Sequence, residues 1–355
     1  MSKKKVLFYL PNLCGGGAER VSINILNQLN REKYEIHLLL GILEGEAVHL
    51  IPQDIEVHNL NSPRTIFSLF KLRKKIKEIK PYAIFSSLNR AHIALNFSLR
   101  GISNKPKTIM RVPSSPKLVF KYNEMDKMFK ILLDISLKNA TTIIAQTPEM
   151  KEEIFEYHSV NKDKIEILIN PLDRKLIDES IEEPFDLFDK GHINVVASGR
   201  LSIEKGYDVL IESFSKVYQR NQTYRLYIIG ADNGNQMDEY KVLIDKFSLQ
   251  GIVTFLGFQQ NPYKFYFHSD LFVLSSRREG LPNTILENLY LNKPVVGTRC
   301  IPFMEELIKD GENGFLVDVE SVEQLADAIL NFKELSDKKG FVNDDLILEK
   351  DIFSI

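Results

Sequence analysis

Two glutamates lie on either side of a tight turn in the last third of the chain. Glu279 follows the apolar run LFVLSS at 271–276, and Glu287 lies eight positions further on, beyond the Gly-Leu-Pro turn at 280–282. An ionised carboxylate accepts hydrogen bonds from hydroxyl groups, so one glutamate could hold the hydroxyls of a sugar and the other the diol of a ribose. The pair therefore predicts a binding site for a molecule that carries both.

The helix after this turn offers a second kind of contact. Asn283 and Thr284 begin it, and the free N–H groups of a helix N-terminus favour phosphate groups. A purely structural alternative is that Asn283 or Thr284 caps the helix and that Glu287 completes a capping box with Thr284. Both interpretations can hold for Glu287. Together, the two glutamates and the turn fit one ligand, a nucleoside diphosphate sugar.

Other strand ends in the second half carry cations and glycines. Arg200 and Lys205 lie in SGRLSIEKGYD at 198–208, between an apolar strand and a helix. Such a pair suits a diphosphate, because arginine can contact two oxygens at once; alternatively, both are solvated surface charges. Gly230 and Gly257 each follow an apolar strand directly, and a backbone without a side chain could approach a flat ring or a ribose there.

A glycine-rich loop follows the first strand, in CGGGAER at 14–20. Gly15, Gly16 and Gly17 would let backbone N–H groups approach a phosphate at a helix N-terminus. The dinucleotide fingerprint is absent, because Arg20 stands where its third glycine should be, and no Gly-Lys-Ser/Thr follows. A tight turn without a ligand is the alternative.

Short β-branched runs alternate with helical patterns along the whole chain, which is typical of parallel sheets covered on both faces. The series runs twice, so we expect an α/β fold of two Rossmann-like domains whose strand ends face each other across a ligand-binding cleft. The expected strands are 5–10, 34–40, 82–87, 107–112, 141–146, 193–198, 224–230, 253–257, 271–276 and 294–298, and the expected helices include 18–30, 64–80, 206–220, 237–249, 284–292 and 321–333. The expected parts are a first domain at 1–172, an acid-rich linker at 173–191, a second domain at 192–335 and a short tail at 336–355.

Composition is that of a globular protein, with 44% hydrophobic and 26% charged residues in a chain of 355. The longest apolar run, at 36–43, is too short to span a bilayer. The basic start is followed by too short an apolar run for a signal peptide. Two cysteines form neither a disulfide framework nor a metal cluster. We therefore expect a cytoplasmic protein.

The first half of the chain is basic and the second acidic. Residues 1–170 carry 26 Lys and Arg against 17 Asp and Glu, whereas the remainder carries 20 against 31. This split predicts that the first domain contacts something anionic, although drift in surface composition would also explain it. Segment 64–80 has apolar residues at helical spacing among many cations. It predicts peripheral association with an anionic membrane face, the alternative being an ordinary helix with a solvated basic side.

These motifs together resemble the retaining nucleotide-sugar glycosyltransferases of family four, which have the GT-B fold. The resemblance covers about residues 5–333. It implies that Glu279 holds donor-sugar hydroxyls, that Glu287 holds the ribose, and that Arg200 and Lys205 neutralise the diphosphate. The donor-binding set that it implies is Gly15, Gly16, Gly17, Gly230, Gly257, Gly280, Leu281, Asn283, Thr284 and Glu287.

A finer resemblance lies in SSLNRAHIAL at 86–95 and GFQQNPYKF at 257–265. These segments are similar to those of enzymes that add N-acetylhexosamines to oligosaccharides on polyprenyl diphosphate. The resemblance implies transfer of a hexose or N-acetylhexosamine from a donor, expected to be UDP-linked, to such an acceptor or to another growing cell-surface glycan.

Three departures from the family pattern bear on these expectations. Many members carry a Gly-Gly pair where this chain has Pro302-Phe303, which puts backbone contacts to the ligand there in doubt. Many place a histidine in a cleft loop of the first domain; here His92 is the nearest candidate for a catalytic role, and packing is its alternative. Members usually end in a helix that crosses back to the first domain, whereas this chain stops where that helix would begin, so it is either truncated or complete with a weaker clamp.

Three functions remain open at this point. The leading one is sugar transfer with retention of configuration, in which fixed cations stabilise the leaving group. No Asp-x-Asp motif occurs, so we expect neither a metal nor another cofactor. We also do not expect the protein to bind nucleic acid. A nucleotide-sugar 2-epimerase and a non-catalytic nucleotide-sugar-binding homologue are the alternatives.

Overall fold

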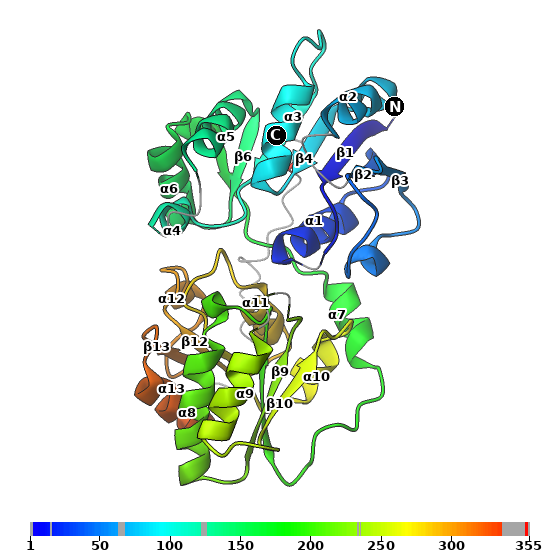
Figure 1. The fold of residues 1–355 in the computed structure, drawn as a ribbon. Helices are drawn as coiled ribbons and strands as arrows, with labels where there is room; N and C mark the ends of the chain where they lie inside the picture. The colour runs from blue at the N-terminus through cyan, green and yellow to red at the C-terminus, as the bar shows by residue number, and fades with distance from the viewer. Residues whose placement is uncertain are drawn as a thin grey trace. The chain divides into compact units, whose positions relative to one another are not determined.

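The structure is a computed structural model of the 355-residue chain, drawn in Figure 1. It describes residues 3–14, 16–62, 68–121, 126–232, 234, 236–335 and 352–353. The chain divides into two units, the first made of Met1–Asp173 with Asp345–Ile355 and the second of Arg174–Asp344. The division falls one residue after the start of the linker that the sequence predicts.

The first unit is built on a seven-stranded parallel sheet in the order β3-β2-β1-β4-β5-β6-β7. Alternate residues of β1 enter two different hydrophobic clusters, Val6 and Phe8 one and Leu7 and Tyr9 the other, so both faces of this strand are buried. The strands are β1 Lys4–Leu10, β2 Tyr34–Leu40, β3 Glu56–Asn59, β4 Ala83–Ser86, β5 Lys107–Arg111, β6 Thr142–Ala145 and β7 Ile165–Ile167. The helices are α1 Gly17–Gln28, α2 Leu69–Ile79, α3 Asn89–Ser98, α4 Pro116–Lys121, α5 Lys127–Asn139 and α6 Pro148–His158.

The second unit has a six-stranded parallel sheet in the order β10-β9-β8-β11-β12-β13. The chain runs outward from β8 to β10 and then returns to β11, on the other side of β8. This reversal is the place where open α/β sheets bind ligands. The strands are β8 Ile193–Ser198, β9 Tyr224–Ile229, β10 Val253–Gly257, β11 Leu271–Leu274, β12 Val295–Thr298 and β13 Gly314–Val317. The helices are α7 Arg174–Ile181, α8 Tyr207–Arg220, α9 Met237–Lys246, α10 Tyr263–His268, α11 Asn283–Tyr290, α12 Met304–Leu307 and α13 Val322–Asn331.

The doubly wound α/β architecture and every expected strand are confirmed. Strands β3, β7 and β13 were not expected; each is the last strand at one edge of its sheet and is only three or four residues long. Short edge strands carry little of the apolar pattern that identifies a buried strand. The helix expected at 64–80 begins at Leu69, and residues 63–67 lie outside the described part of the chain.

The expected linker at 173–191 contains a helix, α7, which belongs to the second unit. Ile177 is buried, Tyr290 donates a hydrogen bond to Asp178 at 2.9 Å, and Asn261 donates to the carbonyl of Ser180 at 2.8 Å. These contacts join residues that are far apart in the sequence. The acidic composition of the segment could not reveal them, and it therefore predicted an irregular linker.

Little of the expected tail lies within the described residues. Ile352 and Phe353 are buried in the first unit, where the ring of Phe353 lies 5.7 Å from that of Phe8 and 5.8 Å from that of Tyr34. The expectation of a missing crossover helix falls on residues outside the described ranges. None of the described helices is both long and apolar enough to span a bilayer.

Candidate functional site

The loops that follow β8 and β11 meet at the reversal of the second sheet. Lys205 Nζ lies 2.6 Å from Oε1 of Glu279, and Ser276 Oγ donates to the same oxygen at 2.7 Å. The side chain of Lys205 is 21% exposed and that of Glu279 13%. The structure thus joins two of the predicted site residues in one ion pair that solvent still reaches.

A close backbone approach holds this pair in place. Gly206 has φ +64°, and a Cβ there would lie 2.2 Å from the carbonyl oxygen of Ser275, so only glycine fits. Ser275 Oγ donates in return to the carbonyl of Lys205 at 2.8 Å. A Cβ at Gly199 would lie 2.8 Å from Cε of Lys205. Gly199 and Gly206, at the two ends of the loop, therefore leave the room that Lys205 needs to pack against the end of β11.

Two further ion pairs join the loop after β11 to the loop after β8 and to the first turn of α8, and the sequence analysis did not predict them. Arg277 contacts Asp208 through two hydrogen bonds, at 2.9 and 2.7 Å, and Arg278 contacts Glu204 at 2.7 Å. A hydrogen bond from Ser202, followed by smaller effects that include Arg278, lowers the pKa of the Glu204 carboxyl to about 2. The Arg-Arg pair before Glu279 was a visible signal, but its partners lie about 70 residues earlier in the chain.

Arg200 differs from Lys205 in its surroundings. It is exposed, and among the described residues it has no hydrogen bond or ion pair. The backbone beside it is fixed, because the N–H of Leu201 donates to the carbonyl of Ala231 at 2.9 Å. The guanidinium can therefore contact a ligand without first breaking a contact of its own.

Gly230 directly follows β9 and Gly257 is the last residue of β10, and each is a glycine for a different structural reason. A Cβ at Gly230 would lie 1.8 Å from the carbonyl oxygen of Gly199, and the N–H of Gly230 donates to Gly257 at 2.9 Å. Gly257 has φ +67° with open space around its Cα. Gly230 is thus required for close contact between strand ends, whereas Gly257 is favoured by its backbone conformation.

The capping interpretation of α11 is wrong. The helix begins at Asn283, its N-cap is Pro282, and no side chain caps it. Asn283 and Thr284 are half-buried inside the first turn, so neither occupies the cap position. Glu287 is 2% exposed, in the interior beside the turn where Leu281 is buried and Gly280 half-buried. A glutamate so deeply buried is unusual.

Two sequence families match adjoining parts of the chain. The family described as Glycosyltransferase Family 4 matches residues 15–176, and that described as Glycosyl transferases group 1 matches residues 179–340. The chain belongs to these glycosyltransferase families. An uncharacterized glycosyltransferase of Methanocaldococcus jannaschii is 34% identical over 271 residues, which are 74% of this chain and 66% of that relative.

Two further proteins are similar to this glycosyltransferase over most of its length. A Campylobacter jejuni protein, N-acetylgalactosamine-N,N'-diacetylbacillosaminyl-diphospho-undecaprenol 4-alpha-N-acetylgalactosaminyltransferase, is 29% identical over 331 residues, 90% of this chain and 87% of that relative. The crystal structure of Anabaena Alr3699/HepE in complex with UDP-glucose superposes with a TM-score of 0.75 over 94% of this chain and 92% of the other, at 19% identity. The fold is therefore GT-B, as expected.

One departure from the family pattern lies at the start of helix α12. Phe303 is buried and is the N-cap of α12, and Pro302 is exposed. Cys300 nearby is buried; burial, with a smaller effect from Glu279, raises the pKa of its thiol to about 12. This thiol is therefore protonated at neutral pH, and a nucleophilic role is not supported for it.

The predicted residues of the first unit follow strands of its own sheet. Gly16 is the N-cap of α1 and Gly17 its first residue, whereas Gly15 lies outside the described residues. His92 is buried, with Nδ1 2.8 Å from Ser86 Oγ and Nε2 3.1 Å from the carbonyl oxygen of Arg111. Burial lowers the pKa of His92 to about 3. Its neutral, fully hydrogen-bonded ring favours the packing alternative.

Proposed function

We propose that this glycosyltransferase transfers a hexose or N-acetylhexosamine from a UDP-linked donor, with retention of configuration, to a saccharide on polyprenyl diphosphate or to another cell-surface glycan. The observation that carries the proposal is the Lys205–Glu279 pair at the reversal of the second sheet. The acceptor of the Campylobacter relative, a saccharide on diphospho-undecaprenol, and the UDP-glucose bound to the Anabaena protein support the acceptor and donor classes.

The roles of the residues follow from their chemistry. Glu279 accepts hydrogen bonds from donor-sugar hydroxyls, and Glu287 from the ribose. Lys205 and Arg200 neutralise the diphosphate. In the reaction, the bond from C1 to the diphosphate oxygen breaks, and a bond from the acceptor oxygen to C1 forms on the same face. The hydroxyl proton passes to the departing diphosphate, whose growing charge the two cations stabilise.

The experiment is a transfer assay with UDP-N-acetylglucosamine, UDP-N-acetylgalactosamine, UDP-glucose and UDP-galactose, using a synthetic polyprenyl-diphosphate-linked N-acetylhexosamine as acceptor. Release of UDP together with an extended acceptor that keeps the donor's anomeric configuration supports the proposal. An epimer formed from donor alone indicates the 2-epimerase. Donor binding without turnover on any acceptor indicates a non-catalytic homologue.

Turnover should survive a chelator. Lys205 and Arg200 supply the positive charge that a divalent ion would otherwise bring to the diphosphate, and the sequence has no Asp-x-Asp motif. We expect initial rates at 25 °C within about twofold of the untreated rate after dialysis against EDTA. Loss of turnover that magnesium or manganese restores would contradict metal independence.

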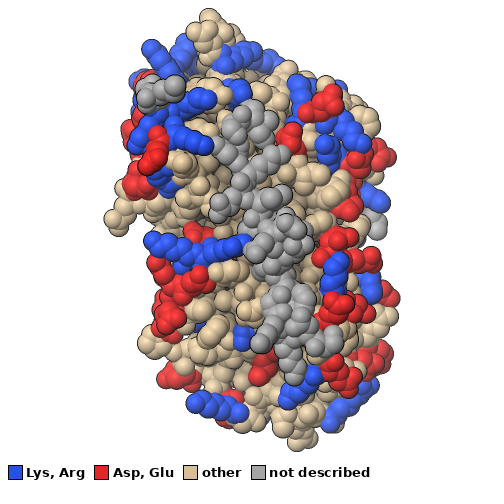
Figure 2. Space-filling model, turned by 180° about the vertical axis from the view of Figure 1, so that it is seen from behind, with Lys and Arg blue, Asp and Glu red and all other residues tan. Residues whose placement is uncertain are grey.

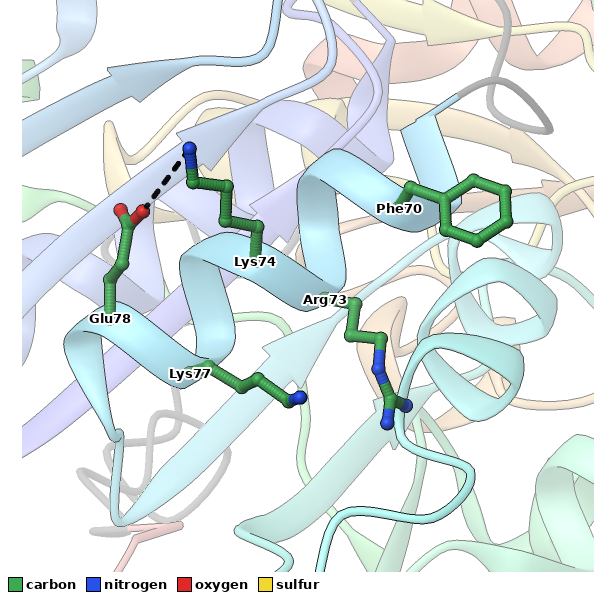
Figure 3. A pocket seen from close by; sticks show the side chains of 5 residues that line it. All are labelled: Phe70, Arg73, Lys74, Lys77 and Glu78. Carbon is green, nitrogen blue, oxygen red and sulfur yellow. Dashed lines mark ion pairs between the residues drawn. The ribbon is translucent and has the colours of Figure 1, made fainter.

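The membrane prediction involves helix α2 of the first unit. Its apolar residues Leu72, Ile76 and Ile79 are buried in the unit, as in an ordinary surface helix. The outer side carries Phe70, which is 87% exposed, with Arg73, Lys74, Lys77 and Glu78 around a shallow hollow (Figure 3). Lysines and arginines are numerous over the first unit on the face shown in Figure 2. An exposed aromatic ring among cations suits the interface of an anionic bilayer.

We expect the protein to float with liposomes that contain phosphatidylglycerol at low salt and to dissociate at high salt. Each basic residue near the surface contributes about 1 kcal/mol, so Lys74→Glu with Lys77→Glu should remove most of the binding. A matched control reverses two exposed lysines of α5, Lys127→Glu with Lys138→Glu, and should bind like the parent. Equal loss of liposome binding in both variants would indicate general charge attraction. Failure of the parent protein to float at low salt would contradict membrane association.

A further inference from the structure

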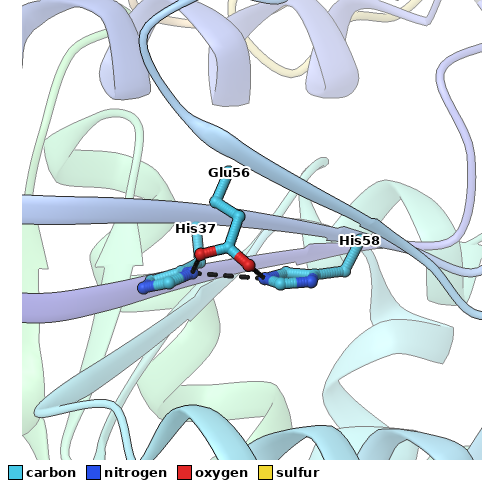
Figure 4. A group of neighbouring side chains, drawn as sticks. All are labelled: His37, Glu56 and His58. Carbon is cyan, nitrogen blue, oxygen red and sulfur yellow. Dashed lines mark hydrogen bonds and ion pairs between the residues drawn. The ribbon is translucent and has the colours of Figure 1, made fainter.

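Two histidines and a glutamate converge on adjacent strands at the edge of the first sheet. In the parallel register of β2 and β3, His37 pairs with Glu56 and Leu39 with His58. Glu56 and His58 are two residues apart and so point to the same side. Nδ1 of His37 lies 3.2 Å from Nε2 of His58 and 3.3 Å from Oε2 of Glu56, and Nε2 of His58 lies 3.5 Å from Oε1 of Glu56. Figure 4 shows the carboxylate beside the two rings.

The cluster gathers three electron-pair donors at one place. Nε2 of His37 lies 3.0 Å from Oε1 of Glu35, and an ionised carboxylate only accepts hydrogen bonds, so that nitrogen carries a proton. Nδ1, the other nitrogen of His37, faces Glu56 and Nε2 of His58.

Helix α2 brings two more charged side chains near His58. These are Lys75 and Glu78, and they pair with each other at 2.9 Å. A cation that accepts electron pairs from both nitrogens and from the carboxylate would balance the cluster.

We propose that His37, His58 and Glu56 bind a zinc ion that ties the edge strand β3 to β2. Ligand atoms about 2.0–2.2 Å from a tetrahedral zinc lie about 3.3–3.6 Å apart, and the three separations here are 3.2, 3.3 and 3.5 Å. Within the described part of the chain, no other group of three His, Cys, Asp or Glu side chains brings its ligand atoms this close together. Glu35 holds the second nitrogen of His37, as carboxylates do for zinc-bound histidines.

Modest movements complete the site. The ring centroids are 5.4 Å apart and the ring planes differ by 15°, so the nitrogens face each other nearly edge to edge. Both rings must turn toward Glu56 to reach a common ion, and the proton of His58 must move to its Nδ1. The side chain of Glu56 is 63% exposed, whereas those of His37 and His58 are 3% and 11% exposed. Zinc can therefore enter from the side of Glu56, and the fourth position is left for water.

This inference is independent of sugar transfer, which we assign to residues of the second unit. The test uses the full chain, freed of any histidine tag and dialysed against EDTA, and titrates it with zinc by calorimetry. We expect one zinc per chain and, with cobalt as a probe, visible absorption bands of a tetrahedral ion. At a hundredfold excess of zinc over Kd, the unfolding temperature of the first unit should rise by about 5–10 °C.

Variants decide whether these residues hold the ion. Glu56→Ala, at an exposed position, should keep the fold and weaken zinc binding at least tenfold, and Glu35→Gln should weaken it about 10- to 100-fold. His192→Ala is the matched control, because His192 also contacts a carboxylate, Asp189, at 2.9 Å. It should bind zinc like the parent. No zinc bound at micromolar concentrations, or equal affinity in the parent and in Glu56→Ala, would overturn the proposal.

Discussion

Lys205→Ala and Arg200→Ala should each lower kcat about 100- to 1000-fold, or about 2.7–4 kcal/mol in the barrier, while the protein stays folded. Negative charge grows on the diphosphate as the glycosidic bond breaks, and only interactions that strengthen with that charge lower the barrier. Both residues lie on the loop after β8, where the second sheet reverses. The ammonium of Lys205 is held by Glu279 before the reaction begins, whereas for Arg200 only the backbone beside it is held.

The measurement is steady-state kinetics with the donor and acceptor of the transfer assay, and circular dichroism as the folding control. Lys205→Arg should not restore full activity, because a planar guanidinium cannot take the place of a compact ammonium packed against Gly199. Lys216→Ala is the matched control: this lysine of α8 pairs with Glu323 and should leave kcat unchanged. Rates within about threefold of the parent for both alanine variants would mean that the pair is only a surface feature.

The sequence predicted the residues of the site better than the contacts between them. Lys205 and Glu279 were each identified from the loops around them, but their contact depends on β8 and β11 being neighbours, which only the strand order reveals. Arg277 was missed for the same reason, because its partner Asp208 lies in the first turn of α8. Local patterns report which residues end a strand, whereas pairing across a parallel sheet is set by the crossovers.

The wrong capping prediction and the missed histidine cluster each have a specific structural cause. The capping interpretation required α11 to begin after Asn283 or Thr284, but the helix begins one or two residues earlier, after Pro282. Helix ends are the least certain feature that a sequence pattern provides. The histidine cluster escaped notice because β3, with the sequence EVHN, is short and polar, so nothing indicated that His58 lies beside His37.

Glu279 should be nearly as sensitive as Lys205, for a different reason. Its carboxylate would accept hydrogen bonds from sugar hydroxyls, and a hydrogen bond to a charged group contributes about 1.5–3 kcal/mol. Glu279→Gln keeps the size and one acceptor but removes the charge. We therefore expect kcat/KM to fall about 10- to 150-fold, and Glu279→Ala to fall at least as far. A matched control is Glu212→Gln on α8, which should leave kcat/KM unchanged.

The decisive measurement is the double variant Lys205→Ala with Glu279→Ala. In the structure Glu279 holds Lys205 at 2.6 Å, so part of its contribution is to keep the ammonium in place for the diphosphate. Once Lys205 is absent, Glu279 can no longer contribute to the rate by positioning it. Residues that act as a unit give effects that do not multiply. We therefore expect the double variant to lie within about tenfold of Lys205→Ala alone. If the two losses instead multiply fully, Glu279 and Lys205 act separately on the donor, and the ion pair belongs only to the ligand-free state.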